Sequence, residues 1–211
     1  QQKFESFLND NFKLIYESLY RLYQNEKYIE VISKCEENII SFSGEPVVSK
    51  LEFLKSLAIA RVYGFKEYEK ALQFIKLNYS VTLEGKEAER ILNEVLPQIK
   101  NDKFKENKLS ENYKIIYVFE KHENEKISQQ LNDLQQYIDE VDFLDLRVSE
   151  DFYNNIVTFV VVHGLKSYDG SFGLSERLEK TINIQADSFF VISSDNYKTI
   201  QIHKNLEQFR N

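Results

Sequence analysis

The chain has 211 residues, a formal net charge of −7, six glycines and two prolines. Its length can bury one or two compact cores, and its few glycines and prolines exclude a low-complexity chain. The negative charge repels phosphate backbones, so nucleic acid is not expected as a partner. No apolar run approaches the roughly 18 residues that cross a bilayer, which predicts that the chain has no transmembrane segment.

Cys35 is the only cysteine, so no disulfide can form within the chain. The chain contains no methionine and begins at Gln1. These features predict either a mature protein whose leader has been removed or a piece of a longer protein. A removed leader would place the protein outside the cytoplasm.

Apolar residues recur at spacings of three and four through the first half of the chain, which predicts α-helices. A polar break at 24–27, the loop 43–46 and Gly64 separate these helices. A last helix, from Glu84 to about Ile99, closes the series. The other predicted helices cover residues 12–23, 28–39, 51–62 and 68–79.

Two helical hairpins of the same design follow from this pattern, and they align at an offset of forty residues. The second helix of each hairpin carries an aromatic residue, a small residue three positions on and a larger apolar residue four positions further. This pattern resembles the tetratricopeptide repeat, whose usual period is 34. Residues 1–104 are therefore predicted to form a domain of stacked TPR-like hairpins. The matching positions are Tyr28, Val31 and Cys35 in the first hairpin and Tyr68, Ala71 and Ile75 in the second.

Residues 100–112 are polar and lack periodicity, which predicts a boundary between two domains. Residues 113–211 then read as the order β-α-β-β-α-β with one added strand, a small ferredoxin-like α/β domain. The whole chain is thus predicted to be α+β. The predicted strands are 113–119, 143–148, 156–162, 189–193 and 199–203, and the predicted helices are 127–138 and 174–181.

RNA-recognition domains share this strand order, so nucleic acid requires a second test. Their third strand carries base-stacking aromatics in a Lys/Arg-Gly-Phe motif. The third predicted strand here, Ile156–Val162, has neither a basic residue nor a glycine. Motif and charge therefore both argue against nucleic acid.

Each candidate for chemistry has a simpler interpretation. His163 and His203 end predicted strands, but no His/Cys/Asp cluster has metal-ligand spacing, so backbone hydrogen bonds are expected instead of a metal. The loop Asp169–Gly173 has the glycines of an anion site, yet a plain turn before a helix explains it. Cys35 is predicted to be a buried thiol. With no nucleophile motif or carboxylate pair, we expect no catalytic residue, no cofactor and no enzyme activity.

Five segments resemble one family: Tyr28–Cys35, Val48–Arg61, Asn78–Leu92, Phe159–Leu165 and Ile192–Leu206. They look like the last repeats and the closing domain of the large tetratricopeptide lipoproteins of the type IX secretion and gliding apparatus, the PorW/SprE type. That resemblance implies a periplasmic protein at the inner face of the outer membrane, peripherally associated with it and bound to envelope proteins of a secretion complex. Members are longer and carry a lipidated N-terminal cysteine, so the chain corresponds to a C-terminal fragment or a short relative.

The function that these observations favour is a non-catalytic scaffold or adaptor. Stacked hairpins expose a groove for a peptide or a helix, and the α/β domain offers a sheet face or edge. Tyrosines in such positions also pack between helices, and that alternative stays open. A second alternative is a SPOR-like peptidoglycan-binding or glycan-binding module, based on strand order and on aromatics exposed on a sheet. The predicted partner-binding residues are Tyr16, Tyr20 and Tyr23 in the groove, and Tyr168, Asn196, Tyr197 and His203 around the sheet loops.

Overall fold

The computed structural model describes residues 2–141 and 145–211, and the side chains within them from residue 11 onward. By its internal contacts the chain divides into two compact units, Gln1–Asp102 and Lys103–Asn211. The first unit is built of helices, and the second holds a four-stranded antiparallel sheet with helices. The chain is therefore α+β, as its sequence predicted.

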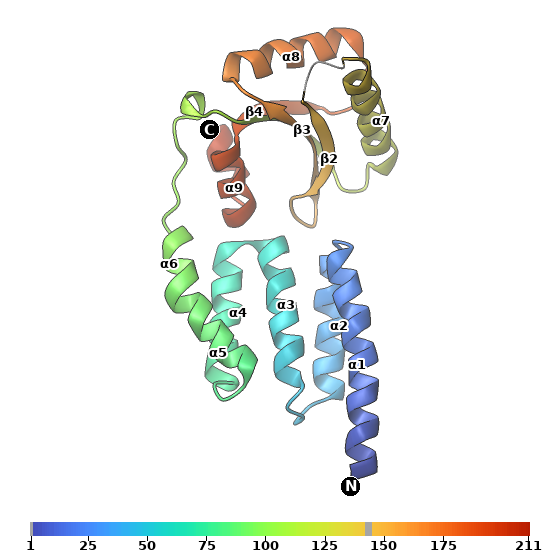
Figure 1. Cartoon of the computed structure of the whole chain (residues 1–211), viewed down its shortest axis with the longest axis vertical. Coiled ribbons are helices and arrows are strands. Elements are labelled where there is room, and N and C mark those ends of the chain that lie inside the picture. The colour runs from blue at the N-terminus through green and yellow to red at the C-terminus, as the bar shows by residue number, and fades with distance from the viewer. Residues whose placement is uncertain (1, 142–144) are drawn as a thin grey trace. The chain divides into compact units, whose positions relative to one another are not determined.

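Helices that follow one another in the first unit pack side by side (Figure 1). Helices α1 and α2 form one hairpin and α3 and α4 a second, and α5 packs against α4. The last predicted helix is divided by a π-helical turn at Ile91–Val95. The helices are α1 (Gln2–Gln24), α2 (Tyr28–Ser41), α3 (Val48–Tyr63), α4 (Phe65–Asn78), α5 (Leu83–Arg90) and α6 (Leu96–Ile99).

Two glycines explain how short connections join these helices. Gly64 has φ 80° and ψ −165°, a conformation that only glycine adopts readily, so α3 ends and α4 begins at the same residue. Thr82 caps α5, because its hydroxyl accepts a hydrogen bond from the Gly85 N–H at 3.1 Å. A side chain at Gly85 would collide with the carbonyl of Tyr79. The turn between α4 and α5 therefore requires glycine at this position.

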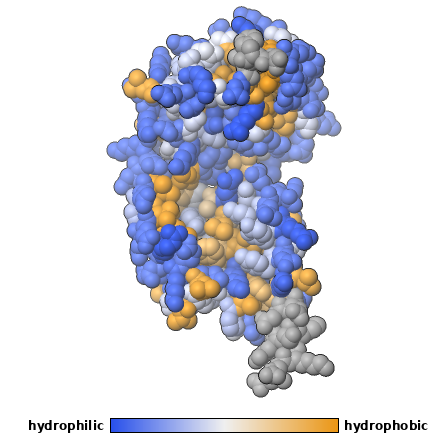
Figure 2. All heavy atoms as spheres, in the orientation of Figure 1, coloured by the Kyte–Doolittle hydropathy of each residue, from blue (hydrophilic) through white to orange (hydrophobic). Residues whose placement is uncertain are grey.

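The core of the first unit lies between the middle helices. Its fully buried members sit three, four or seven residues apart in each helix, as one buried helical face requires. Figure 2 shows that hydrophobic residues also reach the surface over α3 and the helices beside it, with hydrophilic residues around them. This unit therefore has apolar surface that its own core does not use. The hydrophobic members with no exposed area are Val31, Cys35, Leu51, Ala58, Leu72 and Ala88.

The sheet of the second unit has the strand order β2-β3-β1-β4, and every neighbouring pair is antiparallel. The central strands β1 and β3 are buried on both faces, which explains why their sequences are almost continuously apolar. The strands are β1 (Tyr113–Glu120), β2 (Arg147–Phe152), β3 (Val157–Leu165) and β4 (Ser188–Ser193). The helices are α7 (Asn124–Glu140), α8 (Tyr168–Thr181), α9 (Ser194–His203) and α10 (Leu206–Arg210), and a 3-10 turn spans Asn107–Leu109.

Helices cover both faces of this sheet. Residues of α7 and α8, including Leu134 and Leu178, pack on one face against alternate residues of β1 and β3. Ile200 of α9 and Leu206 of α10 pack on the other face, against Ile116 and its neighbours. The sheet is thus the middle of three layers (Figure 1).

The predicted strand at Thr199–His203 is wrong, because this segment belongs to α9. Its alternating Thr-Ile-Gln-Ile-His sequence fits a strand, but the Ser193 hydroxyl accepts a hydrogen bond from the Asn196 N–H at 3.3 Å and starts a helix. Tyr197 and Ile200, three residues apart, then pack on the sheet. Capping and burial therefore outweigh the local alternation.

Two other element predictions also change. The predicted strand 143–148 is displaced to β2, and its residues 143 and 144 lie outside the described residues. The segment Asp169–Gly173, predicted as a turn or an anion-holding loop, lies in the first turns of α8. Ser167 caps that helix by accepting a hydrogen bond from the Gly170 N–H at 3.1 Å. The predicted helix therefore begins six residues earlier than its apolar pattern, at Tyr168.

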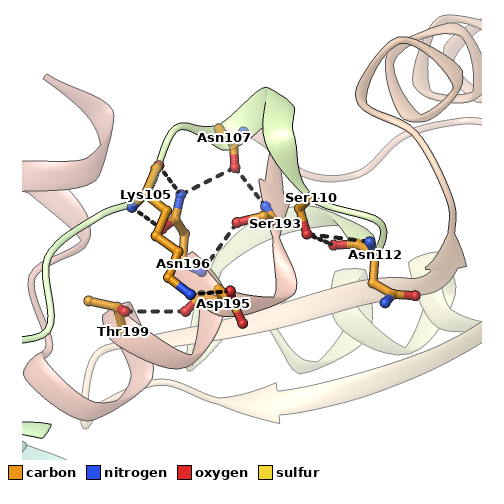
Figure 3. Close-up of polar contacts among 8 residues, drawn as sticks. All are labelled: Lys105, Asn107, Ser110, Asn112, Ser193, Asp195, Asn196 and Thr199. Atoms are coloured by element: carbon orange, nitrogen blue, oxygen red, sulfur yellow. Dashed lines mark hydrogen bonds and ion pairs between the residues drawn. The ribbon is translucent and has the colours of Figure 1, made fainter.

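The segment 103–112, predicted as a connection, is part of the second unit. Figure 3 shows the Asn196 side chain facing Lys105 of this segment, whose backbone N–H and carbonyl it binds, each at 2.9 Å. The Asn107 side chain accepts from the Ser193 N–H at 2.7 Å and donates to the Val191 carbonyl at 3.0 Å. Because β4 is an edge strand, Asn107 occupies backbone groups that another chain would otherwise pair with.

Candidate functional site

Five polar side chains meet on the sheet face that α9 covers. Lys114 comes from β1, His163 from β3, Ser149 and Asp151 from β2, and Tyr197 from α9. The His163 ring is central: its Nδ1 lies 2.8 Å from Lys114 Nζ, and its Nε2 lies 2.7 Å from Ser149 Oγ. The network therefore joins three strands and one helix.

The partners fix the direction of each hydrogen bond. A lysine ammonium only donates, so His163 Nδ1 accepts and Nε2 carries the ring proton that it donates to Ser149. The Ser149 hydroxyl then donates to Asp151 Oδ1 at 2.6 Å, and the Tyr197 hydroxyl donates to Asp151 Oδ2 at 2.5 Å. Both carboxylate oxygens of Asp151 are thus occupied.

The environment keeps His163 neutral near pH 7. Its side chain is buried, and burial together with the charge of Lys114 lowers the pKa of His163 to about 4. Asp151 opposes this shift, and Arg147 adds to it. Burial also lowers the pKa of Lys114, because desolvation disfavours its charged form.

This arrangement does not activate Ser149 as a nucleophile. In a Ser-His-Asp triad, the imidazole accepts the serine proton and donates its other N–H to a carboxylate. Here the imidazole donates to Ser149, and its second nitrogen faces an ammonium group. The geometry suits a hydrogen-bond network that holds the strands and α9 together. Lys114 Nζ also lies 5.3 Å from the centre of the Tyr197 ring.

A groove of about 510 Å³ lies in the helical unit between α1, α3 and α5. The Phe12 ring forms part of its floor, 5.8 Å from the Tyr16 ring and 5.5 Å from the Phe42 ring. Burial raises the pKa of Tyr16, and the nearby Glu84 carboxylate adds to that increase. The lining residues are Phe12, Lys13, Tyr16, Glu17, Val47, Lys50, Phe53 and Glu84.

The charges of this groove are only partly used within the chain. Glu84 accepts a hydrogen bond from Ser49 at 2.8 Å, which fixes α5 against α3. Among the residues that the structure describes, Lys13, Glu17 and Lys50 make no ion pair. The groove thus combines an aromatic floor with charged side chains that have no partner in this part of the chain.

A second groove, of about 700 Å³, lies between α2, α3 and α4. Four of its five charged side chains are paired: Lys55 lies 2.9 Å from Glu52, and Lys70 lies 2.6 Å from Glu67, while Glu36 makes no ion pair with the residues that the structure describes. Its remaining lining is mostly apolar. Those residues are Ile32, Ile59, Ala71, Tyr63 and Phe74.

Of the three tyrosines predicted to line the helical groove, only Tyr16 does so. Tyr23 packs edge-on against Tyr28, with ring centres 5.3 Å apart, so it belongs to the contact between α1 and α2. Tyr20 is exposed and stacks on Tyr23 at 6.3 Å. The alternative of tyrosines packed between helices therefore describes Tyr23 well and Tyr16 in part.

The residues predicted around the sheet loops are mostly buried. Asn196 and Tyr197 hold the polar contacts described above, and both are at least nine-tenths buried. Tyr168 is half-buried and packs edge-on against Tyr113, with ring centres 6.1 Å apart. His203 ends α9 and is partly buried. These four residues do not form one exposed surface.

Sequence reasoning missed Ser149, Asp151 and Arg147. They alternate along β2 and so face the same side of the sheet, a period-two signal that was available. The strand predicted at 143–148 contains Arg147 but ends before Ser149 and Asp151. The sequence did not mark Lys114 as a site residue, because a single lysine is common at the end of an apolar strand.

Within the described residues, no group of three or more His, Cys, Asp or Glu side chains is placed to hold a metal ion. No helix within the same residues has the length and the apolar composition needed to cross a membrane. Comparisons with protein-family models, curated proteins and solved structures gave no match to this chain.

Proposed function

We propose that this protein is a non-catalytic scaffold or adaptor, with a TPR-like helical unit and a ferredoxin-like α/β unit. The TPR-like assignment is supported by two consecutive helical hairpins whose aromatic, small and apolar positions repeat after forty residues. The ferredoxin-like assignment is supported by the order β-α-β-β-α-β and by the strand order β2-β3-β1-β4. In place of the added strand, α9 covers the second sheet face.

The groove between α1, α3 and α5 is the proposed partner site, and its lining is the observation that carries the proposal. Phe12, Tyr16 and Phe53 supply an aromatic floor on which an apolar side chain of a peptide can pack. Lys13 and Lys50 supply cations, and Glu17 supplies an anion, none of them used by an ion pair in the described chain. Such a surface fits a protein segment that carries both an apolar anchor and charges.

We further propose that the partner is an envelope protein of a secretion complex and that the protein lies in the periplasm, at the inner face of the outer membrane. The support for this step is the resemblance of the helical and closing segments to the type IX secretion lipoproteins. Fractionation of the native source tests it, since a cytoplasmic pool would overturn the localisation.

The glycan-binding alternative required aromatic side chains exposed on a sheet face. Phe159 of β3 instead lies buried in the core that α9 and α10 cover, together with Tyr153 and with Tyr197 of α9. Because this observation removes the surface on which a sugar would stack, we do not propose that function.

Photo-crosslinking tests the partner site directly. A photoreactive phenylalanine analogue replaces Tyr16 in one full-length variant, and exposed Glu125 of α7 in a matched control. After irradiation of cell envelopes, the Tyr16 variant is expected to form one discrete protein adduct that the control lacks, and the added substitution Phe53→Ala is expected to abolish it.

Identical adducts from both positions would overturn the partner site, as would the absence of any adduct at Tyr16. Retention of the chain on purified sacculi, with no protein adduct, would overturn the scaffold proposal itself. Circular dichroism of each variant checks that the helical unit remains folded.

A further inference from the structure

Three basic side chains stand in one row across three neighbouring strands. The sheet register sets Arg147 of β2 opposite His163 of β3. Lys114 of β1 completes the row, with its Nζ 2.8 Å from His163 Nδ1. The β1–β3 register shifts between Tyr113 and Ile115, where β3 has one residue more than β1, and Lys114 lies at this shift. Because His163 is neutral near pH 7, Lys114 and Arg147 are the two charged members of this row.

The row lines a cavity of about 390 Å³ on the sheet face where β1 and β2 begin. Arg147 is exposed there and makes no ion pair with any residue that the structure describes. Ser194 and Asn112 line the same cavity and carry a hydroxyl and an amide group. The cavity therefore brings two basic side chains, Arg147 and Lys114, and two neutral polar groups to one place.

Two carboxylates lie near these basic side chains, and one of them, Asp151, favours the charged form of Lys114. Both oxygens of Asp151 are occupied by the hydroxyls of Ser149 and Tyr197. Asp145 lines the cavity but forms no ion pair with Arg147 or Lys114 within 4.0 Å. The neutral state of His163 is due first to burial, Lys114 and Arg147 favour it further, and Asp151 opposes it. This positive cavity lies in a chain whose net charge is −7.

We propose that this cavity binds an oxyanion, the phosphate or carboxylate group of a small ligand, between Arg147 and Lys114 and beside His163. The planar guanidinium of arginine matches both groups, because its N–H donors are spaced like two oxygens of either one. The Lys114 ammonium adds a point charge, and the polar groups of Ser194 and Asn112 complete the lining. The site lies wholly in the second unit, so it is independent of the partner groove in the helical unit.

An anion bound at this point has a specific electrostatic consequence. It would offset the charges of Lys114 and Arg147 that disfavour protonation of His163. Asp151 already acts in the same direction, and Asp145 is the other carboxylate of the cavity. Occupancy of the site should therefore raise the pKa of His163, which makes this imidazole a reporter for the proposed ligand.

NMR of the full chain with isotope-labelled histidine tests the proposal. The probes are sodium phosphate and sodium acetate, added in separate titrations, with sodium chloride at matched ionic strength as the reference. A saturable shift of the His163 resonances is expected, together with a rise in its pKa of about 1 pH unit or more. His122, exposed on the β1–α7 turn, is expected to respond only to ionic strength. A response to phosphate, to acetate or to both supports the site and identifies which oxyanion it takes.

The substitution Arg147→Gln is expected to weaken this response at least tenfold, because it removes the exposed cation and keeps a side chain of similar length. Lys198→Gln, at an exposed position of α9 outside the cavity, is the control with the same loss of charge. No saturable change at His163 with either anion would overturn the proposal. An equal response in wild type and in Arg147→Gln would also overturn it, provided that circular dichroism shows the same fold.

Discussion

Asn196 holds the segment from Lys105 to Asn107 against α9, so replacing it by alanine should release that segment and leave the sheet folded. Its amide oxygen accepts from the Lys105 N–H, and its amide nitrogen donates to the Lys105 carbonyl, each at 2.9 Å. A third contact, to Asn107 Oδ1, is longer at 3.4 Å and adds little. The loss therefore amounts to two hydrogen bonds of good geometry (Figure 3).

Each such bond contributes about 1 kcal/mol net, so Asn196→Ala should cost about 2 kcal/mol. Lys105 is exposed, so water can satisfy its backbone groups after the change, and no buried polar group adds to the cost. About 2 kcal/mol corresponds to a roughly 30-fold increase in the population of the open segment. The effect should be confined to this segment, because both lost hydrogen bonds join Asn196 to Lys105.

Hydrogen exchange measured by mass spectrometry reports this opening. Peptides that cover residues 103–109 are expected to exchange roughly 30-fold faster in Asn196→Ala. Asn132→Ala, at an exposed position of α7 whose side chain has no hydrogen bond in the described structure, should leave them unchanged. Equal protection in wild type and in Asn196→Ala would refute the reasoning, since the segment would then be held by contacts other than these hydrogen bonds.

Three further predictions concern other residues. Gly164→Ala should lower the free energy of unfolding by more than 1 kcal/mol in urea denaturation, because Gly164 has φ 94° and a side chain there would strike the Asp145 carbonyl. Gly173→Ala, in α8 with open space around it, should instead raise that free energy by about 0.5–1 kcal/mol. If both substitutions changed the free energy of unfolding in the same direction, this account would be contradicted. Burial raises the pKa of Cys35 to about 12, so a thiol reagent at pH 8 should modify the native protein far more slowly than the urea-unfolded chain, and fast native labelling would show that Cys35 is accessible. The pKa of His163, about 4 when folded, lies below the value of about 6.5 for an unfolded chain, so its contribution to stability is present above about pH 6.5 and is lost as the pH falls toward 4. The urea midpoint should therefore fall more steeply with acidification in wild type than in His163→Gln, and parallel curves would show that the ring is not held neutral.

The groove in the helical unit shows how far residue types predict a site. Both Tyr16 and Tyr23 were expected there, but only Tyr16 lines the groove, whereas Tyr23 packs against Tyr28. Both tyrosines lie on the same amphipathic helix, and their sequence spacing alone does not tell which one meets a neighbouring helix. Lys50 and Phe53, from α3, join the groove only when the hairpins stack.

The sequence alone determined the helical hairpins of the first unit and the apolar strands β1, β3 and β4. The reason is that a period of 3.6 or a run of β-branched residues is a local property that each segment carries with it. It also determined that Cys35 is buried, since that position belongs to the apolar face of its helix.

Where a segment's local sequence fits more than one conformation, contacts in the tertiary structure decided which conformation it adopts. Thr199–His203 alternates like a strand, yet it forms a helix, because the Ser193 cap and the packing of Tyr197 and Ile200 on the sheet favour one. Likewise, the polar segment before β1 is ordered by Asn196, 91 residues away from Lys105. The basic row of Lys114, His163 and Arg147 arises only through the register of three strands. Contacts between distant residues set these features, and such contacts leave no periodic signal in the sequence.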